Sequence, residues 1–97
     1  NTVTRNPWGT SGWIKGEVLD GRPEDGGKYS FAAKVYGEPS ALYGIRGGKV
    51  SKLAIYREEP GRKCVLNYDR GWDIEPEDEV TKAVFCEVLA FLEALQM

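Results

Sequence analysis

The chain has 97 residues, enough for one domain whose core needs no disulfide or metal. Its 41% hydrophobic and 29% charged residues exclude an intrinsically disordered chain, and no apolar run approaches the roughly 18 residues of a membrane span. The net charge of −2 hides an asymmetry: residues 1–72 carry 12 Lys/Arg and 8 Asp/Glu, whereas residues 73–97 carry one Lys and seven Asp/Glu. Such an asymmetry indicates a charged partner.

The first 70 residues predict strands after a short arm. Residues 1–9 show no periodicity, so we expect a flexible arm there, and residues 11–70 should form the sheet. The expected strands are, in chain order, 13–19, 28–36, 41–46, 49–57 and 62–68. Dense turn residues at 20–27 predict a long hairpin connection, and Gly47-Gly48 predicts a two-residue hairpin. Short successive connections favour an antiparallel meander.

Alternation along residues 28–36 identifies the buried face of the sheet. Tyr29, Phe31, Ala33 and Val35 share one face, while polar side chains dominate the other. We expect the sheet side of the core to contain Phe31 and Val35 from this stretch, with Leu53 and Ile55 from residues 49–57.

The last twenty residues predict a helix over 76–96. Pro76 suits a first helical position, and acidic residues load the first turn. Apolar residues then recur at spacings of three and four, as a wide stripe made of Val80, Ala83, Val84, Val88, Phe91, Leu92 and Leu95. The sequence therefore predicts a single α+β domain, an antiparallel meander of four or five strands with one C-terminal helix packed on one face.

Residue types argue against an enzyme or a metalloprotein. The chain has no His, no nucleophile elbow and no phosphate loop between a strand and a helix, so we expect no catalytic residues, metal or cofactor. Cys64 and Cys86 sit in apolar patterns and are interpreted as buried, reduced thiols of a cytoplasmic protein without a membrane segment. A disulfide joining the last strand to the helix remains the alternative.

An acidic run supplies the first candidate binding surface. Five carboxylates fall within seven residues at Asp73, Glu75, Glu77, Asp78 and Glu79. Together with Arg70 they are the residues we expect to bind a partner, by presenting phosphate-like charge to a basic groove. The alternative is complementation of the helix dipole, which does not explain Asp73 and Glu75, since both precede the helix.

The segment before the acidic run is dense in aromatic and polar types. Trp, Tyr and Arg dominate binding hot spots, so residues 67–73 are one candidate hot spot. The favoured interpretation is a structural corner. In it Gly71 allows a sharp turn, Trp72 is buried between sheet and helix, and Arg70 pairs with Asp69 or Asp73.

The outer face of the predicted sheet is the third candidate. By alternation it carries Lys15, Lys34, Tyr36, Lys52 and Tyr56. Lysines interleaved with tyrosines can contact phosphates and stack on bases. An ordinary charged outer face is the alternative, and a pI near 5.2 argues against a dedicated nucleic-acid binder.

From Phe31 to the helix, the order of motifs resembles a family of small uncharacterised proteins of low-GC Gram-positive bacteria, their phages and other mobile elements. The segments that carry the resemblance are Phe31–Tyr36, Tyr43–Ile45, Gly47–Leu53 and Asn67–Asp73, of which Tyr68–Asp73 is the most specific. The chain is also similar in size and charge layout to anti-CRISPR proteins, which block RNA-guided nucleases by covering their basic grooves.

These observations favour a non-enzymatic protein-binding module. The resemblance implies an inhibitor of a host defence complex, of the type that blocks a type II RNA-guided nuclease, and a partner with a basic groove. The alternatives are a nucleic-acid-binding module using the basic outer face and an accessory or structural phage protein. The oligomeric state is left open. Which charged surface the partner touches separates the first two hypotheses.

Overall fold

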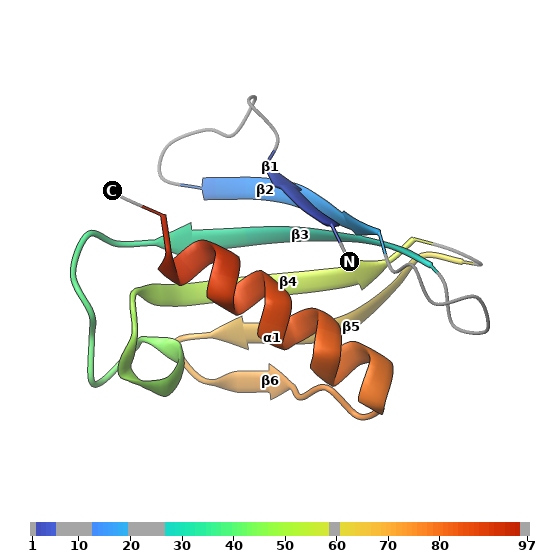
Figure 1. The fold of residues 1–97 in the computed structure, drawn as a ribbon. Helices are drawn as coiled ribbons and strands as arrows, with labels where there is room; N and C mark the ends of the chain where they lie inside the picture. The colour runs from blue at the N-terminus through green and yellow to red at the C-terminus, as the bar shows by residue number, and fades with distance from the viewer. Residues whose placement is uncertain (1, 6–12, 20–26, 59–60, 96–97) are drawn as a thin grey trace.

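The computed structural model describes residues 2–5, 13–19, 27–58 and 61–95. Within these ranges, six strands form one antiparallel sheet in chain order, and one α-helix packs across one of its faces (Figure 1). The strands are β1 (Thr2–Arg5), β2 (Trp13–Leu19), β3 (Lys28–Val35), β4 (Val50–Arg57), β5 (Lys63–Asp69) and β6 (Trp72–Ile74). The helix is α1 (Glu79–Glu93), and a short 3₁₀ helix, η1 (Ile45–Gly47), interrupts the β3–β4 connection. The predicted α+β meander with a C-terminal helix is confirmed.

The two outermost strands are the ones that the sequence did not predict. β1 replaces the expected flexible arm over Thr2–Arg5 and pairs with β2, with Val3 opposite Val18. β6 follows β5 after a tight turn. Both strands are too short for alternation to be visible in the sequence. Residues 6–9 of the expected arm and residues 20–26 of the long connection lie outside the described residues.

The β3–β4 connection also differs from the prediction. Residues 41–46 form no strand, and Gly47-Gly48 does not join two strands directly. Instead the chain turns at Ser40, whose carbonyl accepts a hydrogen bond from Gly44 N at 3.0 Å, and it then enters η1. This local bonding satisfies the backbone groups that a strand would have paired.

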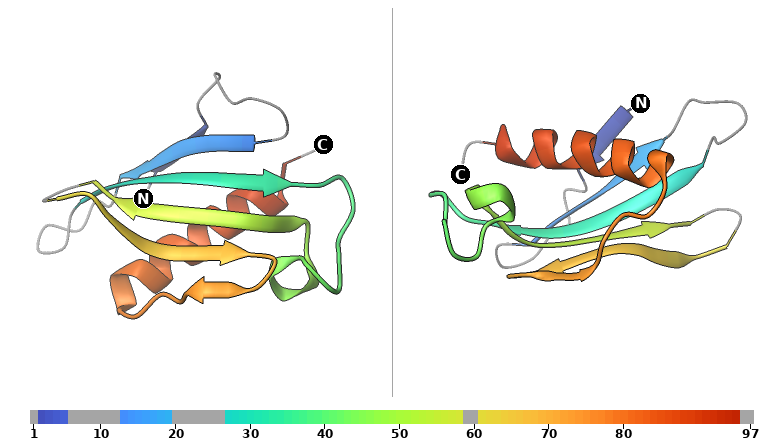
Figure 2. Two further views of the ribbon diagram at one scale, coloured as in Figure 1. Left: turned by 180° about the vertical axis from the view of Figure 1, so that it is seen from behind. Right: turned by 90° about the horizontal axis from the view of Figure 1, so that it is seen from below.

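The core lies between α1 and the sheet face that alternation identified. Tyr29, Phe31, Ala33 and Val35 are all buried, as are Leu53 and Ile55, so the predicted sheet side of the core is confirmed. The view from below shows the two layers, and the view from behind shows the opposite sheet face without a covering helix (Figure 2). The surfaces that remain open to a partner are therefore the uncovered sheet face and the rim around the helix.

The helix buries a stripe slightly rotated from the predicted one. Val84, Val88 and Leu92 are fully buried as expected, but Phe85 and Leu89 are buried in addition. Val80, Phe91 and Leu95 are only partly buried against the core.

The helix begins three residues later than predicted. Asp78 is the N-cap, with extended backbone, and its Oδ1 accepts a hydrogen bond from Thr81 N at 2.7 Å. Pro76 therefore lies before the helix, and Glu79 is the only acid in its first turn. The helix begins after Asp78 because the Asp78 carboxylate accepts a hydrogen bond from the Thr81 amide, which has no acceptor within the helix.

Candidate functional site

The β5–β6 turn is built on Arg70. The expected sharp turn is present, but Gly71 does not supply its left-handed backbone: Arg70 adopts φ +56°, whereas Gly71 has no positive φ. Arg70 N donates to Ser51 O at 2.9 Å, which fixes the turn against β4. The Arg70 guanidinium lies 3.6 Å from Asp69 Oδ1, one of its two predicted partners.

Trp72 lies at the sheet–helix junction but is not buried there. Its ring makes edge contacts with Tyr68 and Phe85, at centroid distances of 5.1 and 5.5 Å. It is nevertheless 40% exposed, so the expectation of a buried plug is wrong. The reason is that β6 ends the sheet, and no further strand covers the outer side of the ring.

A groove opens beside Trp72, between η1, β6 and α1. It measures about 540 Å³, and its lining includes Ile45, Arg46, Trp72, Glu75 and Phe85. We call it the Trp72 groove. The Arg46 guanidinium stands 5.3 Å from the centroid of the Phe85 ring, and Arg46 also adopts a positive φ, +55°.

The acidic run forms an exposed ridge along β6 and the segment leading to α1. We call residues 73–79 the acidic segment. Among the described residues, Asp73, Glu75 and Glu77 have no ion-pair partner. Glu79 pairs with Lys82 at 3.7 Å, and Asp78 is occupied as the helix cap. Of the five predicted carboxylates, three are therefore neither ion-paired nor used as a helix cap within the described part of the chain.

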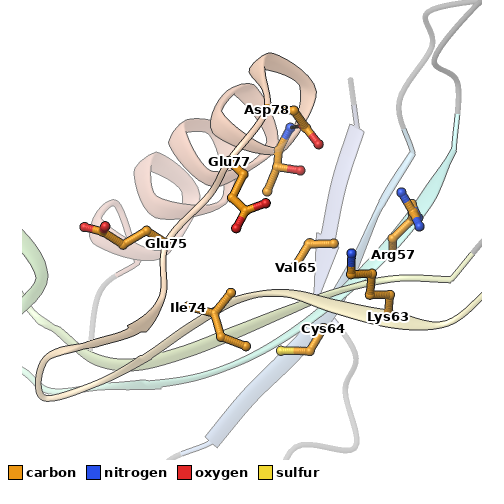
Figure 3. A pocket seen from close by; sticks show the side chains of 9 residues that line it. Arg57, Lys63, Cys64, Val65, Ile74, Glu75, Glu77 and Asp78 are labelled. Carbon is orange, nitrogen blue, oxygen red and sulfur yellow. Dashed lines mark hydrogen bonds between the residues drawn. The ribbon is translucent and has the colours of Figure 1, made fainter.

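Part of the acidic segment faces cations across a small cleft (Figure 3). This charged cleft, of about 90 Å³, has Glu77 and Asp78 along one wall and Arg57 and Lys63 along the other. Hydrogen bonds from Thr81 to the Asp78 carboxylate, reinforced by the charges of Arg57 and Lys63, lower its pKa below the usual 3.8. Asp78 is therefore primarily structural.

The residues predicted for the basic face lie near one another on the sheet. Lys34 stands opposite Lys52 on neighbouring strands, and Lys34 Nζ lies 5.9 Å from the centroid of the Tyr36 ring. Lys15 and Tyr56 line another shallow hollow on the same sheet, where Arg62 stacks 4.4 Å from the Tyr56 ring centroid.

Arg70 does not join the acidic segment, with which it was grouped in the sequence. It lines a hollow of about 470 Å³ beyond the end of β3, with Tyr36, Glu38, Ser40, Tyr43 and Ser51. We call this the tyrosine hollow. The sequence did not predict that Tyr43 and Ser51 lie beside Arg70, because it is the course of residues 36–49 that brings Tyr43 to the start of β4.

A profile of a domain of unknown function, DUF7678, matches residues 12–93. The chain belongs to this family. No curated protein and no solved structure matches it. The DUF7678 match ends at the last residue of α1, so it includes the Trp72 groove, the acidic segment and the tyrosine hollow, and it leaves β1 outside.

Both cysteines of this DUF7678 domain are free thiols, and no disulfide joins them. Cys64 is half-buried, but Cys86 is exposed, so the expectation that both are buried is wrong. Cys86 lies just off the buried stripe of α1, next to Phe85. Within the described part of the chain, no three His, Cys, Asp or Glu side chains gather as metal ligands, and no helix is long and apolar enough to cross a membrane.

Proposed function

We propose that the protein is a non-enzymatic binding module that docks through β6 and the acidic segment onto a basic surface of a protein or protein–RNA complex. One observation carries this proposal. Trp72 and Ile74 are 40% and 39% exposed, and they flank Asp73 on a strand at the sheet edge. Exposed aromatic and aliphatic side chains within a polar rim are typical of binding hot spots.

The charge of this surface indicates the chemistry of the partner. Asp73 and Glu75 have no ion-pair partner among the described residues, so a partner's Lys or Arg can pair with them without breaking an internal contact. Glu75 also lines the Trp72 groove, which places charge beside the apolar anchor. Electrostatic complementarity of this kind steers association and fixes the orientation of the partner.

We further propose, from the resemblance to anti-CRISPR proteins, that the partner is a type II RNA-guided nuclease. The test is cleavage of a matched DNA by the purified nuclease with its guide RNA, after incubation with increasing amounts of the protein. We expect inhibition by the wild type and by a Lys34→Glu/Lys52→Glu variant. Inhibition should be lost in an Asp73→Lys/Glu75→Lys variant, which leaves the helix cap intact.

The docking surface is tested separately from the nuclease. Tagged wild-type protein and the same two variants are used to purify partners from an extract of the host cell. A protein recovered by the wild type and the lysine variant, but not by the acidic-segment variant, supports the surface. Recovery should fall as salt rises, since surface charges are screened beyond about 8 Å at physiological ionic strength. Loss of the partner in the lysine variant alone contradicts the proposal and favours the basic face.

A further inference from the structure

The tyrosine hollow lies apart from the proposed docking surface and has its own chemistry. It forms where the β3–β4 connection passes the β5–β6 turn, and its lining includes Tyr36, Tyr43, Arg70 and Ser51. About 470 Å³ is within the usual range for small-ligand sites.

The two tyrosine rings are held in place while remaining open to solvent. Tyr36 and Tyr43 are 48% and 50% exposed. Tyr36 N donates to Lys49 O at 3.0 Å, and Tyr43 N donates to Ser40 Oγ at 3.0 Å. The Tyr43 carbonyl in addition accepts a hydrogen bond from the Tyr68 hydroxyl at 3.1 Å. Main-chain contacts thus fix the backbone of both residues, and neither ring belongs to the buried core.

Each ring has its own cation. Lys34 Nζ lies 5.9 Å from the Tyr36 ring centroid, and the Arg70 guanidinium carbon lies 5.9 Å from the Tyr43 ring centroid. Arg70 reaches this position from a left-handed backbone conformation that residues other than Gly rarely adopt. Such strain concentrates where a side chain serves a function.

Ser51 lines the hollow, and its backbone oxygen holds the Arg70 amide at 2.9 Å. Its hydroxyl is buried and has no hydrogen-bond partner among the described residues. On β4 the Ser51 side chain is in phase with Leu53 and Ile55, so the nucleotide contacts come from the rings and cations and not from this hydroxyl.

We propose that the tyrosine hollow binds a nucleotide unit, with the base stacked on Tyr36 or Tyr43 and the phosphate held by Arg70 and Lys34. The combination of rings and cations carries this choice. A sugar would use the rings alone and a carboxylate the cations alone, whereas a nucleotide uses both. The unit comes either from single-stranded nucleic acid or from a free nucleotide.

Two carboxylates lie at the site: Glu38 lines the hollow, and Asp69 pairs with Arg70. Asp69 Oδ1 lies 3.6 Å from Arg70 Nε and 3.7 Å from Lys52 Nζ, so it competes with a phosphate for Arg70. All three groups are partly exposed, and a phosphate can displace Asp69 without opening the core. Replacing Asp69 by Asn should therefore tighten nucleotide binding.

The test is titration of the full chain with labelled eight-nucleotide single-stranded RNA and DNA, with AMP, and with ATP, at low and physiological salt. Tyr43→Ala should weaken binding about fivefold or more, the range found when a stacking aromatic is removed. Arg70→Gly should weaken it and reduce the slope of log K against log salt by about 0.7 for each lost phosphate contact. Asp69→Asn should strengthen it.

Arg46→Gly is the matched control, because Arg46 is also an arginine at positive φ over an aromatic ring, but in the Trp72 groove. It should leave nucleotide affinity unchanged. Both glycine variants relieve a left-handed backbone, so both should fold, and Tyr43→Leu replaces Tyr43→Ala if that variant does not.

Tight binding of the oligonucleotides with weak binding of AMP and ATP identifies single-stranded nucleic acid. Equal binding of mononucleotides and oligonucleotides identifies a free nucleotide. The proposal is overturned if no nucleotide binds at low salt, or if the two Arg→Gly variants weaken binding equally. The Asp73→Lys/Glu75→Lys variant should retain nucleotide binding, which separates this result from the fate of the docking surface.

Discussion

The carboxylate of Glu93, in the last turn of α1, accepts two hydrogen bonds from the backbone amide of Lys49, at 2.9 Å to Oε2 and 3.1 Å to Oε1. The amide of Val50 lies 3.4 Å from Oε2. In return, Lys49 Nζ donates to Leu95 O at 3.1 Å. The end of the helix is thereby tied to the start of β4 and to the connection that forms the tyrosine hollow.

Replacing Glu93 should loosen this tie. Glu93→Ala leaves the Lys49 amide without its acceptor, and an unsatisfied, partly buried donor costs about 1–3 kcal/mol. Urea denaturation should show a lower midpoint with an unchanged slope. Lys82→Ala, on the exposed side of the same helix, is the control and should remain within about 0.5 kcal/mol of the wild type. Equal stability of the two variants would contradict a structural role for Glu93.

Gly44 of the β3–β4 connection and Gly71 of the β5–β6 turn should respond in opposite ways to substitution by Ala. A Cβ at Gly44 would overlap the Gly48 carbonyl oxygen and lie 2.8 Å from Ser40 O, and both obstacles are backbone atoms. Gly44→Ala should therefore destabilise the protein by more than about 1 kcal/mol. A Cβ at Gly71 meets nothing within 4 Å, so Gly71→Ala should be neutral or stabilise by up to about 1 kcal/mol through the unfolded chain. The melting temperatures of the two variants, compared with that of the wild type, test both expectations.

Asp78 should make stability depend on pH in the acid range. Its pKa is lowered on folding by hydrogen bonds from Thr81, so its stabilising effect is complete above the unfolded value near 3.8 and is lost as pH falls through the folded value. Asp78→Ala should cost about 1 kcal/mol at pH 7 as a lost helix cap. Asp78→Asn keeps the cap without the charge. Its stability should change less than that of the wild type between pH 5 and pH 2, as the pH falls from above the unfolded value toward the lowered folded value.

Trp72→Ala should separate binding from stability. The ring contacts Tyr68 and Phe85 but remains 40% exposed, so truncation should cost about 1–3 kcal/mol, below the 3–5 kcal/mol of a core tryptophan. Circular dichroism should show a folded protein at 25 °C, while partner recovery falls. A loss of 4 kcal/mol or more, outside that range, would restore the interpretation of Trp72 as a buried plug.

The two cysteines should differ in reactivity. Cys86 is exposed, whereas Cys64 is half-buried, with Sγ 3.4 Å from Leu66 O. A thiol reagent in native buffer should modify Cys86 rapidly and Cys64 slowly, and both at once in denaturant. Peptide mass spectrometry after brief labelling identifies the site. Equal rates in native buffer would mean that β5 opens readily.

The regular parts of the fold could be predicted because their signals are local. Every second side chain of β3 is buried in the core, so the alternation is visible in the sequence. Phe31 and Val35 could therefore be assigned to the correct side. The start of α1 was predicted wrongly because Pro76 and Asp78 both favour a helix start. Only the Thr81 amide, bound to Asp78 in three dimensions, decides between them.

The candidate sites could be predicted only where they are contiguous. The acidic segment is visible as a run of carboxylates, although its division into structural Asp78 and exposed Asp73 required the structure. The tyrosine hollow could not be found in this way. It unites Tyr36, Tyr43 and Arg70, which come from three parts of the chain, through a connection whose η1 turn has no periodic pattern.

The meander order has a consequence for synthesis of the chain. Each strand pairs with the one made just before it, so the sheet can assemble from local hairpins as it emerges, and α1 is made after all of them. Until α1 arrives, Phe31, Ile55 and Leu66 form part of an uncovered apolar face. A nascent chain stopped before Glu79 should therefore associate with chaperones or with other copies of itself. The chain that includes α1 and the chain stopped before Glu79 should differ sharply in solubility, although both contain the whole sheet.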